Sequence, residues 1–323
     1  MKKIIASSLL TLSLFATDNS SLFDDISSAL DTNVTDKLKL ETIKEYVDGI
    51  KFDDDYNKSK SSFTLMSHYE NYMLLGSYSP TTLYEKAYGD DKQRDPSRDY
   101  ERDSNEAQYQ LSIKVPLYRN FLNTGAELFT AYTQNSYWQV YDTAHSSPFR
   151  ETNYMPELFM EWTPDKKIGS STLQKIRLAI IHQSNGQDLG KSRSWNRTEM
   201  MFLFKKDNLY YGFNAWNRWD EEAKSSRVQI EGDDNVNLQE YIGKQKYFIK
   251  YKSDIGNILL SHQNRIFAYN INKGNTKIDL TFPSPNKNVD FFIRGFHGYG
   301  ESLIDYDVKL SRVSFGIMIA DWL

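Results

Sequence analysis

The segment HQSNGQDLGKSRSWN at residues 182–196 contains the side chains of this sequence that are best suited to chemistry. His182 and Ser184 are two residues apart, so on an extended strand their side chains point to the same face. Asn196 follows near the start of the next extended segment. A hydroxyl, an imidazole and an amide can provide a nucleophile, its general base and a group that orients the base. Spacing alone also allows a simpler interpretation, in which all three are polar residues at a loop end.

The strand face that these residues occupy is apolar. Upstream, the residues with the parity of His182 and Ser184 are Ile176, Leu178 and Ile180. Downstream, the residues with the parity of Asn196 are Met200, Phe202 and Phe204. The opposite parity is polar or charged and includes Lys175, Arg177, Gln183, Arg197, Glu199 and Lys205. We therefore expect the candidate catalytic groups on the apolar face of their strands.

Alternating polar and apolar residues follow one another from Phe63 to the C terminus. They predict strands at 63–78, 106–117, 124–140, 152–163, 172–184, 194–206, 208–218, 238–252, 255–264, 275–282, 288–299 and 306–321. Many exceed the about 5–6 residues usual for soluble strands, and their ~10-residue scale fits tilted strands that cross a membrane. Tight links such as 206–208 contrast with long charged links such as 80–104 and 219–236. These features predict an all-β fold, a transmembrane antiparallel up-and-down β-barrel of about 12 strands.

Composition narrows the class of protein. Aromatic residues make up 14% of the chain, with 22 Tyr, 18 Phe and 6 Trp, which suits the aromatic girdles of a membrane barrel. The chain has no cysteine, which excludes disulfides, thiolate metal sites and cysteine nucleophiles. A net charge of −4 is too small to suggest a nucleic-acid partner. A soluble β-sandwich or barrel would also explain the alternation, but it explains the long strands and abundant aromatics less well.

The N-terminal segment predicts export. Lys2 and Lys3 precede a mostly apolar stretch at 4–15 and the small residue Ala16, which is typical of a signal peptide at residues 1–16. Residues 17–60 are polar and acidic, and we expect them to form an N-terminal extension. The barrel domain is expected to cover residues 61–323.

Several strings resemble the outer membrane phospholipase A family. They are YTQNSYWQ at 132–139, SSPFRETNYMPELF at 146–159, HQSNG at 182–186, SRSWNR at 192–197 and GYGESLIDY at 298–306. The resemblance runs from about Phe63 to the C terminus. Members of that family are outer-membrane barrels that hydrolyse phospholipid acyl esters with calcium and act as dimers. The resemblance implies a bacterial outer-membrane location, phospholipase A1 and A2 activity together with lysophospholipase activity, and Ca²⁺ as the cofactor.

The resemblance also implies roles for single residues. Ser184 would be the nucleophile, His182 the general base and Asn196 the group that orients the imidazole. This assignment is physically sound, because serine needs a neighbouring base and asparagine can accept from an imidazole N–H. The backbone N–H of Gly186 and a calcium-polarised water would stabilise the oxyanion.

Calcium, by the same resemblance, would bind the Ser192 hydroxyl and the backbone carbonyl of Gln187. The carbonyl of Ser146 from a second copy would join them, since hard cations prefer oxygen ligands. The sequence departs from the family at this site in two ways. Many members have arginine where this chain has Gln187. The acidic residue of this loop, Asp188, which is a further candidate ligand, stands one position earlier than expected. The acidic run at 220–222 could supply charge near a second cation.

Two further groups leave alternatives open. Gln134 shares the parity of Tyr132 and Trp138, and an amide facing hydrocarbon is costly unless it is paired. The resemblance implies that Gln134 pairs with its copy across a homodimer interface; otherwise the amide would lie near hydrated headgroups. Arg150 and Glu151 should alternate faces on a regular strand, so we expect a structural role for them rather than a shared catalytic one.

Two other functions remain compatible with a barrel of this kind. One is a passive pore, although Arg177, Arg197 and Glu199 would help to fill a lumen of this size. The other is an enzyme that removes acyl chains from the lipid part of lipopolysaccharide with a similar serine and histidine. The products formed from phospholipid and from lipopolysaccharide would distinguish these functions.

Overall fold

The computed structural model describes residues 65–81, 83–85, 100–187, 189–225, 229, 232–264, 273–286 and 288–322. The predicted signal peptide at 1–16 and the extension at 17–60 lie outside the described residues. The long strands of the described part are β2 (Asn71–Tyr78), β5 (Asn105–Phe121), β6 (Ala126–Trp138), β7 (Phe149–Trp162), β9 (Ser171–Ser184), β10 (Ser194–Lys206), β11 (Leu209–Arg218), β12 (Gln245–Ser253), β13 (Gly256–Asn264), β14 (Asn275–Pro283), β15 (Asp290–Gly298) and β16 (Leu310–Ala320).

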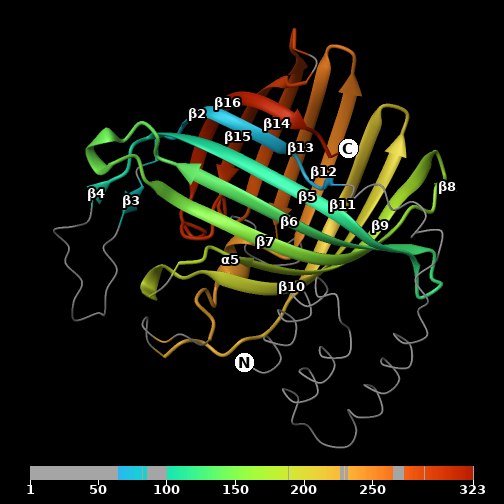
Figure 1. Cartoon of the computed structure of the whole chain (residues 1–323), viewed down its shortest axis with the longest axis horizontal. Helices are drawn as coiled ribbons and strands as arrows, with labels where there is room; N and C mark the ends of the chain where they lie inside the picture. The colour runs from blue at the N-terminus through green and yellow to red at the C-terminus, as the bar shows by residue number, and fades with distance from the viewer. Residues whose placement is uncertain are drawn as a thin grey trace, which may run out of the picture. The chain divides into compact units, whose positions relative to one another are not determined.

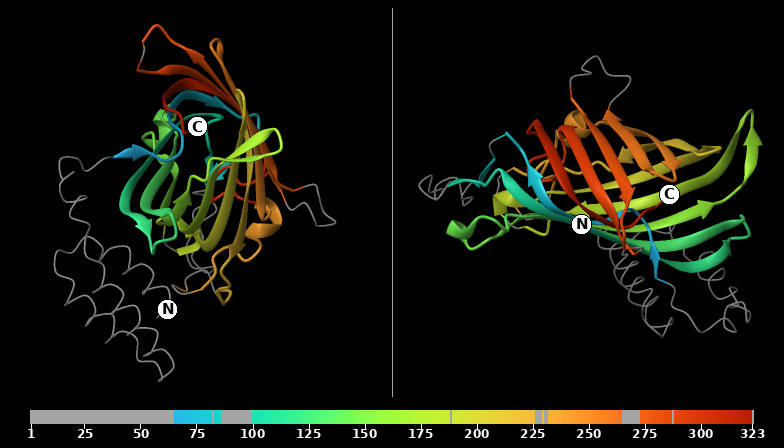
Figure 2. Two further views of the ribbon diagram at one scale, coloured as in Figure 1. Left: turned by 90° about the vertical axis from the view of Figure 1, so that its right-hand side faces the viewer. Right: turned by 90° about the horizontal axis from the view of Figure 1, so that it is seen from above.

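These strands form a closed antiparallel barrel (Figure 1, Figure 2). From β9 to β16 each strand pairs with the next one along the chain, β16 pairs with β2, and β5 joins β2 to β6. β7 closes the remaining gap by pairing with both β6 and β9. The short strands β1 (Met66–Ser67) and β8 (Lys166–Ile168) add to β5 and β9, while β3 (Tyr84–Glu85) and β4 (Tyr100–Glu101) pair with each other. The predicted 12-strand barrel is confirmed. No helix in the described ranges is long and apolar enough to cross a membrane.

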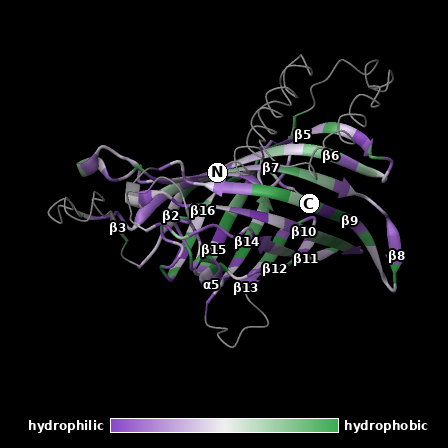
Figure 3. Cartoon of the chain, turned by 90° about the horizontal axis from the view of Figure 1, so that it is seen from below, coloured by the Kyte–Doolittle hydropathy of each residue, from purple (hydrophilic) through white to green (hydrophobic). Residues whose placement is uncertain are grey.

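Polar and apolar residues alternate along the strands, as Figure 3 shows in the alternating purple and green. The large apolar side chains are exposed on the outer wall, and many polar and charged ones are buried in the lumen. The outer wall exposes large apolar side chains, including Leu178, Ile180, Ile249, Ile258, Ile293, Val313 and Phe315. The lumen holds buried ion pairs. Arg177 donates to Glu199 at 2.7 Å, and Arg294 forms two bonds to Asp279 at 2.7 and 2.8 Å. Such alternation suits a wall with lipid on its outer side, because the charges satisfy one another inside.

The connections differ between the two ends of the barrel. At one end the turns are tight, as between β10 and β11 or between β12 and β13. At the other end the connections 139–148, 185–193, 219–244 and 299–309 are long. Short turns at one end and long loops at the other are typical of outer-membrane barrels, in which the long loops face outward from the cell. The segment with the candidate catalytic residues lies at the long-loop end.

A short helix at the long-loop end corrects one strand prediction. The predicted strand at 238–252 begins instead with α5 (Leu238–Ile242), and β12 starts at Gln245. Leu238 and Ile242 are four residues apart, so both lie on one helical face, where they pack with Trp195, Trp216, Leu303 and Tyr306. The Tyr306 hydroxyl donates to Asn237, and burial raises the pKa of Tyr306 to about 12, so this hydroxyl keeps its proton. Helix α5 and loop 299–309 are therefore held together at this end.

A β-bulge at Arg150 corrects the expected alternation of Arg150 and Glu151. In the pairing of β6 with β7, Tyr137 faces Glu151 and Trp138 faces Phe149, which leaves Arg150 as an extra residue. Both Arg150 and Glu151 are therefore buried, although they are neighbours in sequence.

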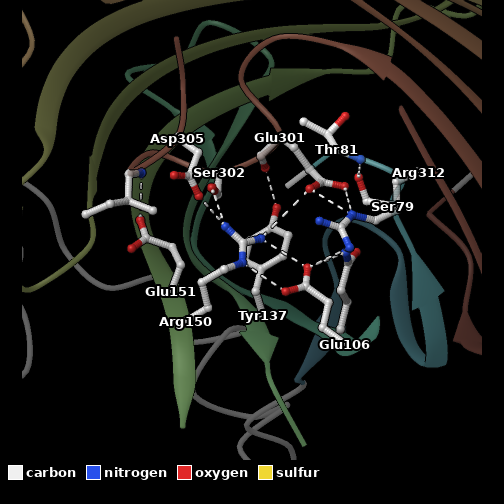
Figure 4. A network of polar contacts seen from close by, with 12 residues as sticks. Ser79, Thr81, Glu106, Tyr137, Arg150, Glu151, Glu301, Ser302, Asp305 and Arg312 are labelled. Carbon is white, nitrogen blue, oxygen red and sulfur yellow. Dashed lines mark hydrogen bonds and ion pairs between the residues drawn. The ribbon is translucent and has the colours of Figure 1, made fainter. Parts of the chain in front are cut away.

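The bulge places Arg150 at the centre of a polar network (Figure 4). Its guanidinium donates to Glu106 at 2.9 and 3.0 Å, to Asp305 at 2.6 Å and to Ser302 at 3.1 Å. Glu151 accepts the backbone N–H of Ile304 at 3.1 Å. These contacts tie loop 299–309 to the barrel wall.

Candidate active site

The hairpin of β9 and β10 brings the candidate catalytic residues together. In its register His182 lies directly opposite Asn196, and Ser184 lies directly opposite Ser194. Directly opposed residues on antiparallel strands have side chains close enough to interact. The sequence pattern indicated a common face for these residues, and the register adds the direct pairing.

The imidazole of His182 is bonded to the amide of Asn196. Nδ1 of His182 lies 2.8 Å from Oδ1 of Asn196, and Nδ2 of Asn196 donates to Oε1 of Glu221 at 2.7 Å. A carboxylate only accepts, so the amide nitrogen faces Glu221 and the amide oxygen faces the imidazole. This arrangement requires a proton on Nδ1 of His182, so that the neutral imidazole has its lone pair on Nε2. Nε2 is the atom that a general base needs.

His182 and Ser184 lie on the outer wall of the barrel and are half-buried. They share their face with Ile180, which is 46% exposed, whereas Ile181 on the opposite face is fully buried. Ser184 is the last residue of β9, so its hydroxyl lies where the apolar wall meets the polar loop. Within the described residues, no hydrogen bond joins the Ser184 hydroxyl to another group.

Asn185 organises the loop that follows the candidate nucleophile. Its side chain is 2% exposed, and its Oδ1 accepts from the backbone N–H groups of Arg193 at 2.9 Å and Gln187 at 3.3 Å. Its Nδ2 donates to the carbonyl of Lys191 at 2.9 Å and to Glu151 at 3.3 Å. These bonds close loop 185–193 on itself and join it to β7. The sequence interpretation did not identify Asn185, although a buried amide directly after a strand is a known means of ordering a loop.

Gly186, in the same loop, has a positive φ of 63°. A Cβ atom at this position would lie 3.0 Å from the ring of Tyr154. Backbone conformation and lack of space therefore both favour glycine next to Ser184.

Of the predicted calcium ligands, Ser192 contacts an acidic residue of the connection 219–244. The Ser192 hydroxyl donates to Oδ2 of Asp234 at 2.7 Å, and the ammonium of Lys224 pairs with the other oxygen of Asp234. Gln187 is exposed, and Asp188 lies outside the described residues. Ser146 is exposed in the β6–β7 loop, directly after the 3₁₀ turn η2 (Thr143–His145), and this loop opens at the same end of the barrel. The described residues contain no group of three or more His, Cys, Asp or Glu side chains placed for a metal ion.

Gln134 has partners within its own chain. Its Nε2 donates to the hydroxyls of Tyr109 at 3.3 Å and Ser136 at 3.2 Å, and its Oε1 accepts from Tyr132 at 3.3 Å. Both amide protons are therefore used, and one acceptor site of Oε1 is left over. The amide is satisfied on the outer wall without a second copy.

Comparison with known proteins agrees with this fold. Residues 50–319 match the family model described as phospholipase A1. A phospholipase A1 of Proteus vulgaris is 35% identical over 260 residues, which cover 80% of this chain and 82% of that protein.

Two similar solved structures are outer membrane phospholipases. One is the Salmonella typhi enzyme, a dimer with bound calcium, with a TM-score of 0.69 and 28% identity over 82% of this chain and 95% of that one. The other is an active-site variant of the Escherichia coli enzyme in which an asparagine is replaced by alanine, with a TM-score of 0.69 and 29% identity over 82% of this chain and 95% of that one. The chain therefore belongs to the phospholipase A1 family, and it is an outer-membrane β-barrel hydrolase of phospholipids.

Proposed function

We propose that this protein hydrolyses the acyl esters of membrane phospholipids in a calcium-dependent reaction, with Ser184 as nucleophile, His182 as general base and Asn196 as the group that orients the base. The substrates would include both acyl positions and lysophospholipids. The bond between His182 and Asn196 is the observation that carries this proposal. The active-site asparagine of the E. coli relative supports the same role for Asn196.

The reaction begins with attack of the Ser184 hydroxyl oxygen on the ester carbonyl carbon, while Nε2 of His182 accepts the hydroxyl proton. The N–H of Gly186 would donate to the oxyanion of the tetrahedral intermediate. When the intermediate collapses, the bond to the glycerol oxygen breaks, and Nε2 returns its proton to that oxygen. Water then attacks the acyl-serine with the same base, which releases the fatty acid and restores Ser184.

The chemistry of the residues near Ser192 fits a hard cation. Because the Ser192 hydroxyl donates its proton to Asp234, both of its oxygen lone pairs remain available. The Ser192 hydroxyl, the Gln187 carbonyl and, from a second copy, the Ser146 carbonyl would hold calcium, with Asp188 as a further candidate and Asp234 as a nearby carboxylate. When bound, calcium would polarise a water that stabilises the oxyanion.

The position of the site on the outer wall gives direct access to lipid. A phospholipid in the outer leaflet lies alongside β9 with its ester near the headgroup boundary, so it need not leave the bilayer. A second copy would complete the calcium site and add apolar surface beside Ser184 for the acyl chain. The S. typhi relative, a dimer with bound calcium, supports a dimer and a calcium site for this protein. If Gln134 pairs with its copy, it must first give up a bond to Tyr109 or Ser136, because both of its amide protons are engaged in the single chain.

A passive pore fits this barrel less well. The lumen contains the ion pairs of Arg177 and Arg294, and the cluster of α5 with loop 299–309 lies at its long-loop end. Neither feature argues against cleavage of the lipid part of lipopolysaccharide, so the test of function includes that substrate.

The test is mass analysis of the products formed from phospholipid vesicles and from lipopolysaccharide, with and without a calcium chelator. The wild-type protein should release fatty acid and lysophospholipid only from phospholipid and only with calcium. Ser184→Ala should abolish release and remain a folded, heat-modifiable barrel, whereas Ser194→Ala, which changes the hydroxyl directly opposite, should keep activity. Near-wild-type activity of Ser184→Ala would show that the nucleophile is misassigned. Release of fatty acid from lipopolysaccharide alone would show that the substrate is misassigned.

A further inference from the structure

The residues that follow β11 continue alongside β10, because Arg218 is paired with Arg197 and the next residue, Trp219, lies beside Asn196. The backbone N–H of Trp219 donates to the carbonyl of Asn196 at 2.9 Å. The indole Nε1 of Trp219 donates to the Thr198 hydroxyl at 3.0 Å. Two independent bonds therefore fix the start of this loop, and Glu221 lies two residues further on, within reach of the Asn196 amide.

Glu221 has a contact that the expected role of the acidic run at 220–222 does not explain. Its Oε1 accepts from Nδ2 of Asn196 at 2.7 Å, a length typical of a bond to a charged group. A carboxylate that only supplied charge near a second cation would not require a hydrogen bond to the Asn196 amide. The bond instead links Glu221 to the side chain that contacts the imidazole.

An asparagine side chain has two ends of nearly equal shape, one a donor and the other an acceptor. If the amide of Asn196 turned over, its NH₂ group would face Nδ1 of His182. The imidazole would then have to accept at Nδ1 and keep its proton on Nε2, and it could not take the proton of Ser184. A neighbouring group that only accepts removes this ambiguity.

We propose that Glu221 is a positioning residue of the reaction: it fixes the orientation of the Asn196 amide and thereby the protonation pattern of His182. The inference rests on the proposed roles of Ser184, His182 and Asn196. The carboxylate also brings a negative charge close to the imidazolium that forms during catalysis, which asparagine itself does not supply. The unit would then consist of serine, histidine, asparagine and glutamate.

The first test compares Glu221→Gln with Glu240→Gln in the full-length protein in detergent micelles, with phospholipid as the substrate. Each variant removes one charge from the connection 219–244, but the side chain of Glu240 is exposed and contacts Lys273. A glutamine in place of Glu221 can both donate and accept, so it no longer selects one amide orientation. We expect kcat to fall on the order of tenfold for Glu221→Gln, with KM changed less than twofold, because one hydrogen bond to a charged group is altered. Glu240→Gln should match the wild type.

The second test uses a background in which Glu221→Gln is expected to raise kcat instead of lowering it. Asn196→Asp places a carboxylate opposite Glu221, at a spacing of about 3 Å where two like charges repel. Adding Glu221→Gln to Asn196→Asp supplies an amide donor to the new carboxylate. We therefore expect Glu221→Gln to lower kcat in the wild type but to raise it at least fivefold in the Asn196→Asp background. A residue with only a structural role would lower kcat in both.

The outcomes separate this inference from the proposed function. Heat-modifiability and the calcium concentration for half-maximal binding should be the same in Glu221→Gln and wild type, which would show that the fold and the calcium loop are intact. If Ser184→Ala is inactive but Glu221→Gln has wild-type kcat, Glu221 has no positioning role and the triad stands. A fall in kcat in both backgrounds would also overturn the inference.

Discussion

Replacing Arg150 by methionine should destabilise the barrel more than most single substitutions. The Arg150 side chain is buried and donates to two carboxylates, Glu106 at 2.9 and 3.0 Å and Asp305 at 2.6 Å, with a third, Glu301, at 3.9 Å. Methionine keeps much of the volume but none of the donors. The substitution therefore leaves buried charge with fewer partners, which is among the costly classes of mutation.

The remaining contacts set the size of the effect. Without Arg150, Glu106 keeps Arg312 at 3.2 Å and Asp305 keeps Arg102 at 3.1 Å, so neither carboxylate is left alone. Breaking a buried ion pair costs about 3–5 kcal/mol. We expect a value near the lower limit, about 3 kcal/mol, which corresponds to roughly a hundredfold change in the unfolding equilibrium constant.

Equilibrium unfolding by urea in lipid vesicles, followed by tryptophan fluorescence and heat-modifiability, would measure this loss. Arg119→Met is the matched control, because Arg119 is exposed near the far end of β5 and its loss should cost less than about 0.5 kcal/mol. The double variant Arg150→Met with Glu106→Gln should lose less than the sum of the two single variants, since both partners of one pair are removed. A loss below about 1 kcal/mol for Arg150→Met, or strictly additive losses in the double variant, would refute the assignment of this network as a stabilising one.

Three further predictions concern the site. Gly186→Ala should lower kcat at least tenfold in a micellar phospholipid assay, because a Cβ atom is strained at this left-handed backbone conformation and would meet the Tyr154 ring, which displaces the N–H of residue 186. Gly125→Ala is the control, because Gly125 has a similar φ but open space around it, and it should leave kcat unchanged. Equal effects of the two substitutions would contradict the role of this N–H. Lys224→Gln should bind calcium several-fold more tightly in a titration, because it removes the ammonium that neutralises Asp234; unchanged affinity would show that this pair does not compete with calcium. Gln134→Ala should weaken the proposed calcium-dependent dimer in sedimentation experiments in detergent, and an unaltered dimer would show that Gln134 is not at the interface.

Strand phase could be predicted from the sequence because it depends on a period of two. The apolar parity of Leu178 and Ile180 placed His182 and Ser184 on the outer wall, and the charged parity of Arg177 and Glu199 predicted the lumen. Both assignments follow from the local pattern, since an unpaired charge that faces lipid is costly and strands therefore keep most charges on the other face.

Features that depend on an extra residue in a strand or on a loop distant in sequence could not be predicted from the local alternation of residues. The bulge at Arg150 breaks the period by one residue, and nothing in the local pattern marks it. The helix α5 did leave a signal, because Leu238 and Ile242 have helical spacing and Gly243 follows, but the adjoining strand pattern masked it. The contact of Glu221 with Asn196 depends on how far the chain continues alongside β10 after β11 ends, and the sequence alone showed only an acidic run.

The position of the site at the rim of the wall follows from the chemistry proposed for it. A general base becomes a cation when it accepts a proton, and a cation facing hydrocarbon is expensive unless it is paired. Ser184 ends β9, Asn196 stands near the start of β10, and Glu221 approaches from a polar loop, so the charge forms where apolar wall and polar loops meet. A serine and histidine placed halfway down the same strand would reach the acyl chains but not the ester, and no loop carboxylate could reach their imidazolium. The proposed nucleophile and base are therefore expected at the end of a strand, where a loop can supply the compensating charge.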